Sequence, residues 1–141
     1  MKQLSCEKEI YGSVLVVDDV ETNLIVTRGL LKPYSLQVDL VKSGMDAIRK
    51  ISDGRIYDVI LMDYMMPGLN GVETMEILRN MGYDYPIVAL VASDLYWNAG
   101  VLFGNGFDDV VSKPIDMRQL DLVLGKYIYD KHTGTSDKAG I

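Results

Sequence analysis

The chain has 141 residues, enough for about one domain that buries roughly two-thirds of its unfolded surface. Its net charge of −6 argues against direct nucleic acid binding, and its single cysteine excludes an internal disulfide. No apolar run approaches the roughly 18 residues of a membrane span and no signal peptide begins the chain, so we expect a cytoplasmic domain without membrane contact of its own.

The first half of the chain alternates between strand and helix patterns. Four consecutive apolar residues at 14–17 predict a strand buried on both faces. The pattern over 21–32 predicts a helix that the following proline ends. Residues 36–40 alternate apolar and polar side chains, which indicates a strand at the edge of a sheet. A second helix is predicted over 43–54, with Ser43 as its N-cap.

The second half continues this alternation. We predict strands at 59–63, 87–92 and 110–111, and helices at 72–81, 94–104 and 116–128. The helix at 94–104 is weak because Gly100 and Gly104 each cost about 1 kcal/mol relative to alanine. Asp116 caps the last helix.

Five strands alternating with five helices predict one α/β domain with a doubly wound parallel sheet. The alternating second strand suits an edge, which gives the strand order 2-1-3-4-5. We place this domain at residues 12–130, after an N-terminal extension at 1–11 and before a polar, disordered tail at 131–141. In this order the chain reverses direction between strands one and three, where α/β sheets bind their ligands.

Charged residues follow three of the predicted strands at that point. Asp18 and Asp19 follow the first strand, Asp63 ends the third, and Lys113 follows the fifth. Three neighbouring carboxylates repel one another, and a bound Mg²⁺ would remove that conflict. A carboxylate nucleophile, a divalent cation and a lysine together point to phosphoryl transfer onto Asp63, which forms an acyl phosphate.

The chain resembles the response-regulator receiver family over about residues 12–130. The matching motifs are Asp18-Asp19, Asp63 with Met66-Pro67 and Gly71, and Lys113-Pro114. The segments 17–23 and 106–109 further resemble the receivers of hybrid sensor histidine kinases. The resemblance implies a flavodoxin-like (βα)5 fold and a role in two-component phosphorelay signalling, as a stand-alone receiver or as part of a hybrid histidine kinase that tethers it to a membrane.

The resemblance also implies a role for each matching residue. Asp63 would take phosphate from a histidine of a kinase or phosphotransfer domain, in a Mg²⁺-dependent self-phosphorylation with slow autodephosphorylation. Asp19 and Asp63 would bind the metal, together with the Met65 carbonyl and with Asp18 acting through a bound water. Lys113 would contact the phosphoryl oxygens, and its bond to the following proline would be cis.

Two positions depart from the family pattern. Val91 stands where the family usually has Thr or Ser, whose hydroxyl bonds the phosphoryl group. Val110 stands where it usually has Tyr or Phe, which swings inward on activation. Valine matches threonine in shape but donates no hydrogen bond, so we expect an atypical switch. Ser93 could reach the site from its loop, although a solvated turn serine is the simpler interpretation.

Two other functions compete with phosphate acceptance. One is a receiver-like interaction module in which phosphorylation is weak or irrelevant, because both switch positions are changed. The other is an aspartyl-phosphate hydrolase, which typically needs a second Asp two residues after the nucleophile; Met65 occupies that position and disfavours this class. A homodimer through the 94–130 face is a further possibility under either receiver hypothesis.

Overall fold

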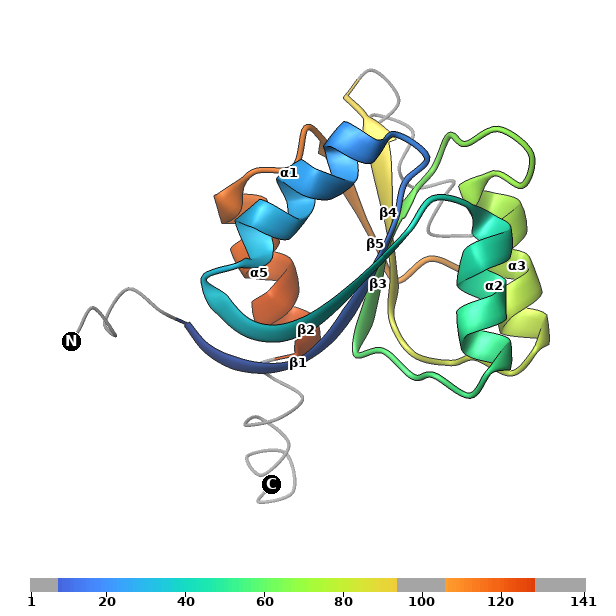
Figure 1. Cartoon of the computed structure of the whole chain (residues 1–141), viewed down its shortest axis with the longest axis horizontal. Helices are drawn as coiled ribbons and strands as arrows, with labels where there is room; N and C mark the ends of the chain where they lie inside the picture. Colours follow the sequence, from blue (N-terminus) through green and yellow to red (C-terminus); the bar gives the residue numbers. More distant parts are fainter. Residues whose placement is uncertain (1–7, 94–105, 129–141) are drawn as a thin grey trace.

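The computed structural model describes residues 8–93 and 106–128, with side chains from residue 12 onward. These residues form one sheet flanked by helices (Figure 1). Its elements are β1 (Lys8–Val17), α1 (Glu21–Leu31), β2 (Tyr34–Val41), α2 (Gly44–Ser52), β3 (Val59–Asp63), α3 (Gly71–Asn80), β4 (Ile87–Ala92), β5 (Asp109–Lys113) and α5 (Met117–Leu124). All strand pairs are parallel, in the order β2-β1-β3-β4-β5. The predicted α/β fold and strand order are confirmed. The helix expected at 94–104 and the tail at 131–141 lie outside the described residues.

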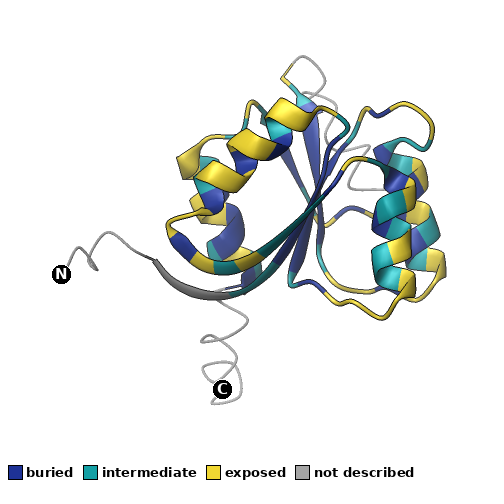
Figure 2. Cartoon of the chain, in the orientation of Figure 1, coloured by how far each residue is buried: buried dark blue, intermediate teal, exposed yellow. Residues whose placement is uncertain are grey.

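The sheet separates two apolar cores. In Figure 1, α1 and α5 cover one face of the sheet, and α2 and α3 cover the other. Side chains of alternate strand residues enter each core, so β3 is buried along its whole length. Figure 2 shows the same division, with dark buried strands between helices whose outer faces are exposed. None of the helices in the described part of the chain has the length and apolarity of a membrane span.

β1 is longer than the predicted strand at 14–17. It begins at Lys8, and from Gly12 onward it pairs residue by residue with β2. β3 pairs only with the last four residues of β1, and the Asp58 carboxylate accepts a hydrogen bond from the N–H of Ser13 at 2.9 Å. The apolar pattern does not extend to this part of β1 because Gly12 and Ser13 are not apolar.

Helix caps agree closely with the sequence. Ser43 caps α2, and Asp116 caps α5, as predicted. Asp116 and Gln119 form a capping box, in which each side chain accepts a hydrogen bond from the other residue's backbone N–H. Asn70 and Glu73 form a second capping box at the start of α3.

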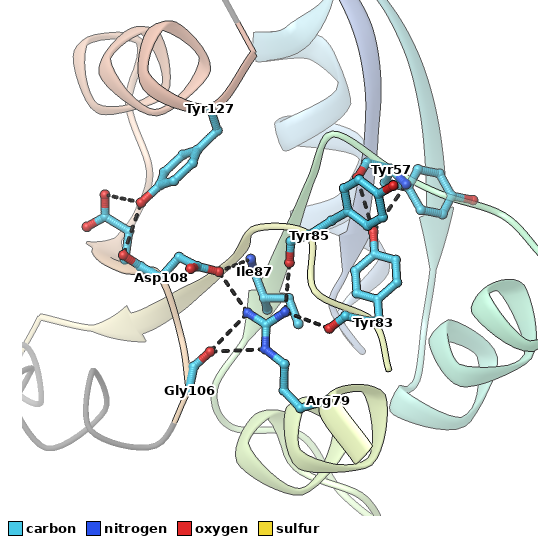
Figure 3. A network of polar contacts seen from close by, with 9 residues as sticks. Tyr57, Arg79, Tyr83, Tyr85, Ile87, Gly106, Asp108 and Tyr127 are labelled. Atoms are coloured by element: carbon cyan, nitrogen blue, oxygen red, sulfur yellow. Dashed lines mark hydrogen bonds and ion pairs between the residues drawn. The ribbon is translucent and has the colours of Figure 1, made fainter. Parts of the chain in front are cut away.

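One arginine connects three elements at the amino-terminal edge of the sheet (Figure 3). The guanidinium of Arg79, at the end of α3, donates to the carbonyls of Tyr83, Tyr85 and Gly106 and to the carboxylate of Asp108. The same carboxylate accepts the N–H of Ile87, the first residue of β4. These bonds hold the starts of β4 and β5 beside α3, and these two strands carry Val91 and Lys113 at their other ends.

Candidate functional site

The four charged residues predicted to converge do meet at the carboxyl-terminal edge of the sheet. One carboxylate oxygen of each of Asp18, Asp19 and Asp63 lies within 4.8 Å of the other two. The Lys113 Nζ donates to Asp63 Oδ1 at 2.9 Å. Asp63 therefore lies between two carboxylates and one ammonium group.

The register of the strands explains this convergence. Val17 of β1 pairs with Met62 of β3, so the residues that follow them, Asp18 and Asp63, lie at the same level. β5 is separated from β3 by β4, and Lys113 pairs with Ala92. The long lysine side chain spans that distance and brings its Nζ to Asp63 Oδ1.

Burial sets the electrostatics of the site. Asp18 and Asp63 are each only 3% exposed, whereas Asp19 is half-buried. Desolvation by burial is the largest influence on the pKa of Asp63, and the pKa is raised even though the hydrogen bond and the charge of Lys113 lower it. The charge of Asp18 raises it further. The site thus holds more negative charge than Lys113 alone compensates.

A hard divalent cation fits this donor set. Carboxylate oxygens are the ligands that Mg²⁺ prefers, and the excess negative charge favours a second cation beside Lys113. The turn after β3 brings the backbone of Met65 back to the site, where its N–H donates to Asp63 Oδ1 at 3.4 Å. Its side chain is exposed.

Gly71 allows α3 to begin directly against the end of β3. A Cβ at this position would lie 2.5 Å from the carbonyl oxygen of Asp63 and 2.9 Å from Tyr64 Cα. The N–H of Gly71 also donates to the Tyr64 carbonyl at 3.0 Å. Because both obstructing atoms belong to the backbone, a side chain here would displace α3 or Asp63.

The two predicted switch positions are apolar and buried. Val91 is 1% exposed and Val110 is 5% exposed, and both belong to the core on the α2 and α3 side of the sheet. Ser93 is exposed and, with Asp18 and Lys113, lines a pocket of about 460 Å³ beside the carboxylates. The bond between Lys113 and Pro114 is cis, as the resemblance implied.

Two residues near the site were not singled out from the sequence. Asn23, on the first turn of α1, donates to Asp18 Oδ1 at 3.5 Å. Gln119 donates to Ser112, the residue before Lys113. The spacing of Asp116 and Gln119 is a capping-box pattern, which would have located Gln119 at the start of α5 but not its bond to β5.

Comparison with protein families and curated proteins gives consistent matches. The family model "Response regulator receiver domain" matches residues 14–124. The two-component response regulator ORR41 of Oryza sativa is 35% identical over 117 residues, which cover 81% of this chain and 92% of that protein. The autoinducer 2 sensor kinase/phosphatase LuxQ of Vibrio harveyi is 39% identical over 103 residues, which cover 72% of this chain but 12% of that protein.

Solved structures resemble the chain equally clearly. One is the receiver domain of the sensor histidine kinase PA1611 from Pseudomonas aeruginosa, which was solved with a magnesium ion in its active-site cleft. Its TM-score is 0.72 at 30% sequence identity, and the match covers 82% of this chain and 96% of that one. The receiver domain of the Francisella response regulator 1452 has a TM-score of 0.75 and 28% identity, and the match covers 82% of this chain and 95% of that one. A yeast receiver co-crystallised with a histidine phosphotransfer protein shares the fold, with a TM-score of 0.79 at 22% identity, covering 89% of this chain and 94% of that one.

Proposed function

Because the chain belongs to the response regulator receiver family, we propose that it is a phosphoacceptor that takes a phosphoryl group from a histidine onto Asp63. The observation that carries this proposal is the position of Asp63, buried at the end of β3 between Asp18, Asp19 and the ammonium of Lys113. This arrangement supplies a nucleophile, a metal site and a counter-charge for a phosphoryl group at one point.

The chemistry uses one carboxylate oxygen of Asp63. Among the described residues, both hydrogen bonds to this carboxylate go to Oδ1, so Oδ2 is free to attack. In the transfer, the bond between phosphorus and the histidine nitrogen breaks, and a bond forms between phosphorus and Oδ2. The nitrogen leaves with the electron pair of the broken bond. Lys113 is placed to stabilise the negative charge on the phosphoryl oxygens.

We place a Mg²⁺ ion among Asp18, Asp19, Asp63 and the Met65 carbonyl. When bound, the ion neutralises the carboxylates and the transferred group. The fit of the donor set supports this assignment, as does the magnesium ion in the PA1611 receiver. The raised pKa of Asp63 is also consistent with a site that needs additional positive charge to keep this carboxylate ionised.

The phosphodonor is a histidine kinase or a histidine phosphotransfer domain that docks on α1. Val20, the N-cap of α1, is 44% exposed, and Ile25 and Val26 within α1 are 52% and 59% exposed; the N-cap directly follows Asp18 and Asp19. Exposed apolar side chains beside a reactive group favour a protein partner over a small solute. The predicted homodimer face at 94–130 includes residues that the structure does not describe, and it stays a prediction.

The competing function is an interaction module that binds partners regardless of phosphorylation. The two valines favour it, because Val91 has no hydroxyl to bond a phosphoryl group and Val110 lacks the aromatic ring that swings inward in the family pattern. The complete set of acids and Lys113 favours phosphate acceptance, because an interaction surface does not require three buried or half-buried carboxylates. We therefore propose a functional acceptor with a weakened switch.

Intact mass spectrometry tests phosphate acceptance. The purified chain is incubated with Mg²⁺ and a small acyl phosphate, beside an Asp63→Asn variant and a sample containing a chelator. We expect the unmodified chain to gain one phosphoryl group, and the variant and the chelated sample to gain none. If the unmodified chain gains no mass, the interaction module becomes the better description.

A further inference from the structure

The side chain of Gln119 bridges the two ends of the loop that follows β5. Its Oε1 accepts from the N–H of Asp116 at 3.1 Å, and its Nε2 donates to Ser112 Oγ at 3.2 Å and to the Ser112 carbonyl at 3.4 Å. A backbone N–H can only donate, so the amide oxygen must face Asp116 and the amide nitrogen must face Ser112. One side chain thus connects β5 to the first turn of α5.

The bond to Ser112 acts directly on Lys113. The Ser112 carbonyl belongs to the same planar peptide unit as the backbone nitrogen of Lys113, so the bond limits rotation of that unit. In the part of the chain that the structure describes, β5 is an outer strand of the sheet and has a neighbouring strand on one side only. Gln119 therefore holds the end of β5 while Lys113 Nζ reaches Asp63.

Helix capping explains only one of these three contacts. In the other capping box of the chain, Glu73 accepts from the N–H of Asn70 and performs the same capping role with a carboxylate. A carboxylate cannot donate a hydrogen bond. The donation from the Gln119 amide to Ser112 is therefore additional to what the cap of α5 requires.

We propose that Gln119 is a positioning residue for Lys113 and that its amide transmits a change at Lys113 to α5. This inference rests on the proposed function of Asp63. It also supplies an output that does not depend on Val91 or Val110, because the path runs from Lys113 through Ser112 and Gln119 to α5. Lys113 must adjust when a phosphoryl group is attached to Asp63, and the Ser112–Gln119 bonds connect its backbone to the first turn of α5 in addition to the intervening loop.

Three variants separate this role from simple capping. Gln119→Glu keeps an oxygen for the N–H of Asp116 but cannot donate to Ser112. Ser112→Ala removes the hydroxyl acceptor from the other side of the same contact. Arg118→Ala is the matched control, because Arg118 is exposed and lies in the same turn of α5.

Two measurements are made on each variant. The first is the rate of phosphoryl gain with Mg²⁺ and a small acyl phosphate. The second is the ¹⁵N chemical shift of Lys113 Nζ in the unphosphorylated chain, which reports the ion pair with Asp63 and which a change in helix capping alone does not move. We expect Gln119→Glu and Ser112→Ala to slow phosphorylation by about threefold or more and to shift the Nζ signal, while Arg118→Ala changes neither.

The outcomes distinguish this inference from the proposed function. If Gln119→Glu matches Arg118→Ala in both rate and Nζ shift, the positioning role is wrong, whatever Asp63 does. If the unmodified chain takes no phosphoryl group, the proposed function fails, and the chemical shift of Lys113 Nζ alone decides the role of Gln119. A changed chemical shift in Gln119→Glu and Ser112→Ala supports that role, and an unchanged one overturns it.

Discussion

Val91 is the residue at which we expect the proposed site to depart from the family pattern. Its side chain is almost fully buried on the α2 and α3 side of β4, whereas Val88 of the same strand is buried on the opposite side. The position to which the resemblance assigns the phosphoryl contact thus has the shape of threonine without its hydroxyl. The missing hydrogen bond should affect both the lifetime of the acyl phosphate and the response of the neighbouring strand.

Val91→Thr should therefore change the decay rate of phosphorylated Asp63. Val88→Thr is the matched control, because it introduces the same hydroxyl into the same strand on the face away from Val91. We expect both variants to lose about 1–3 kcal/mol in the free energy of unfolding if the hydroxyl is unpaired, and only Val91→Thr to alter the decay rate. Equal decay rates in all three proteins would show that the missing hydroxyl has no kinetic role.

Tyr83 is a second single residue with a predictable effect, which is to make the stability of the fold depend on pH. Its hydroxyl donates to the Tyr57 carbonyl and accepts from the Tyr57 N–H, both at 3.1 Å (Figure 3). Burial raises the pKa of Tyr83 from 10.0 to about 12, although the bond to the Tyr57 backbone and the charge of Arg79 oppose the shift. The folded state thus favours the neutral phenol more than the unfolded state does.

The sign of the pH dependence follows from this difference. The stabilisation is fully present below the unfolded pKa, near pH 10, and is lost as the pH rises towards 12. We expect the free energy of unfolding to fall across this interval and to fall less steeply in Tyr83→Phe. That variant should also lose about 1–3 kcal/mol at neutral pH, because the Tyr57 backbone loses its partner.

Tyr64→Phe is the control for Tyr83. Tyr64 is half-buried, and its hydroxyl makes no hydrogen bond with the described residues. Denaturant unfolding between neutral pH and pH 12 provides the comparison. An identical pH slope in unmodified chain and Tyr83→Phe would contradict the assigned role of Tyr83.

At the scale of elements, α3 begins in close contact with the end of β3, and we expect this contact to position Asp63. Gly71 allows this contact because a Cβ would come within 3 Å of two backbone atoms of β3 and its turn. Gly29, in α1, is exposed and has no atom within 4 Å of the same position. Substitution by alanine should therefore change the stability of the chain in opposite directions at Gly71 and Gly29.

Gly71→Ala should destabilise the chain by about 1–3 kcal/mol and slow the phosphorylation of Asp63, because α3 must move away from the end of β3. Gly29→Ala should instead stabilise the chain by about 0.5–1 kcal/mol, since alanine favours an exposed helix interior. Thermal unfolding and the rate of mass gain measure both effects. Normal phosphorylation in a stably folded Gly71→Ala protein would show that this contact does not position Asp63.

The elements themselves could be predicted well where local chemistry specifies them. The apolar run of β4 and the caps Ser43 and Asp116 were all predictable from neighbouring residues. The beginning of β1 at Lys8 was not, because its pairing with β2 and the bond from Ser13 to Asp58 involve residues far apart in the sequence. The same limitation applies to the Arg79 network between α3, β4 and β5.

At the scale of the whole molecule, the topology made the site predictable. In a doubly wound parallel sheet, the residues at the carboxyl ends of β1, β3 and β5 lie at one edge, and this rule brought Asp18, Asp63 and Lys113 together without any structure. The rule does not give the register, which places Asp18 level with Asp63, or the connection from Gln119 to β5. Those details depend on how the elements pack, and they determine how the site would be used.

Phosphotransfer from a protein donor tests the central claim most directly. A histidine phosphotransfer domain carrying labelled phosphate on its histidine is mixed with the chain and Mg²⁺, and the label on each protein is followed with time. The account predicts that label leaves the histidine and appears on the unmodified chain, and that Asp63→Asn receives none. Label that stays on the histidine, or that appears equally on Asp63→Asn, would contradict the assignment of Asp63 as the acceptor.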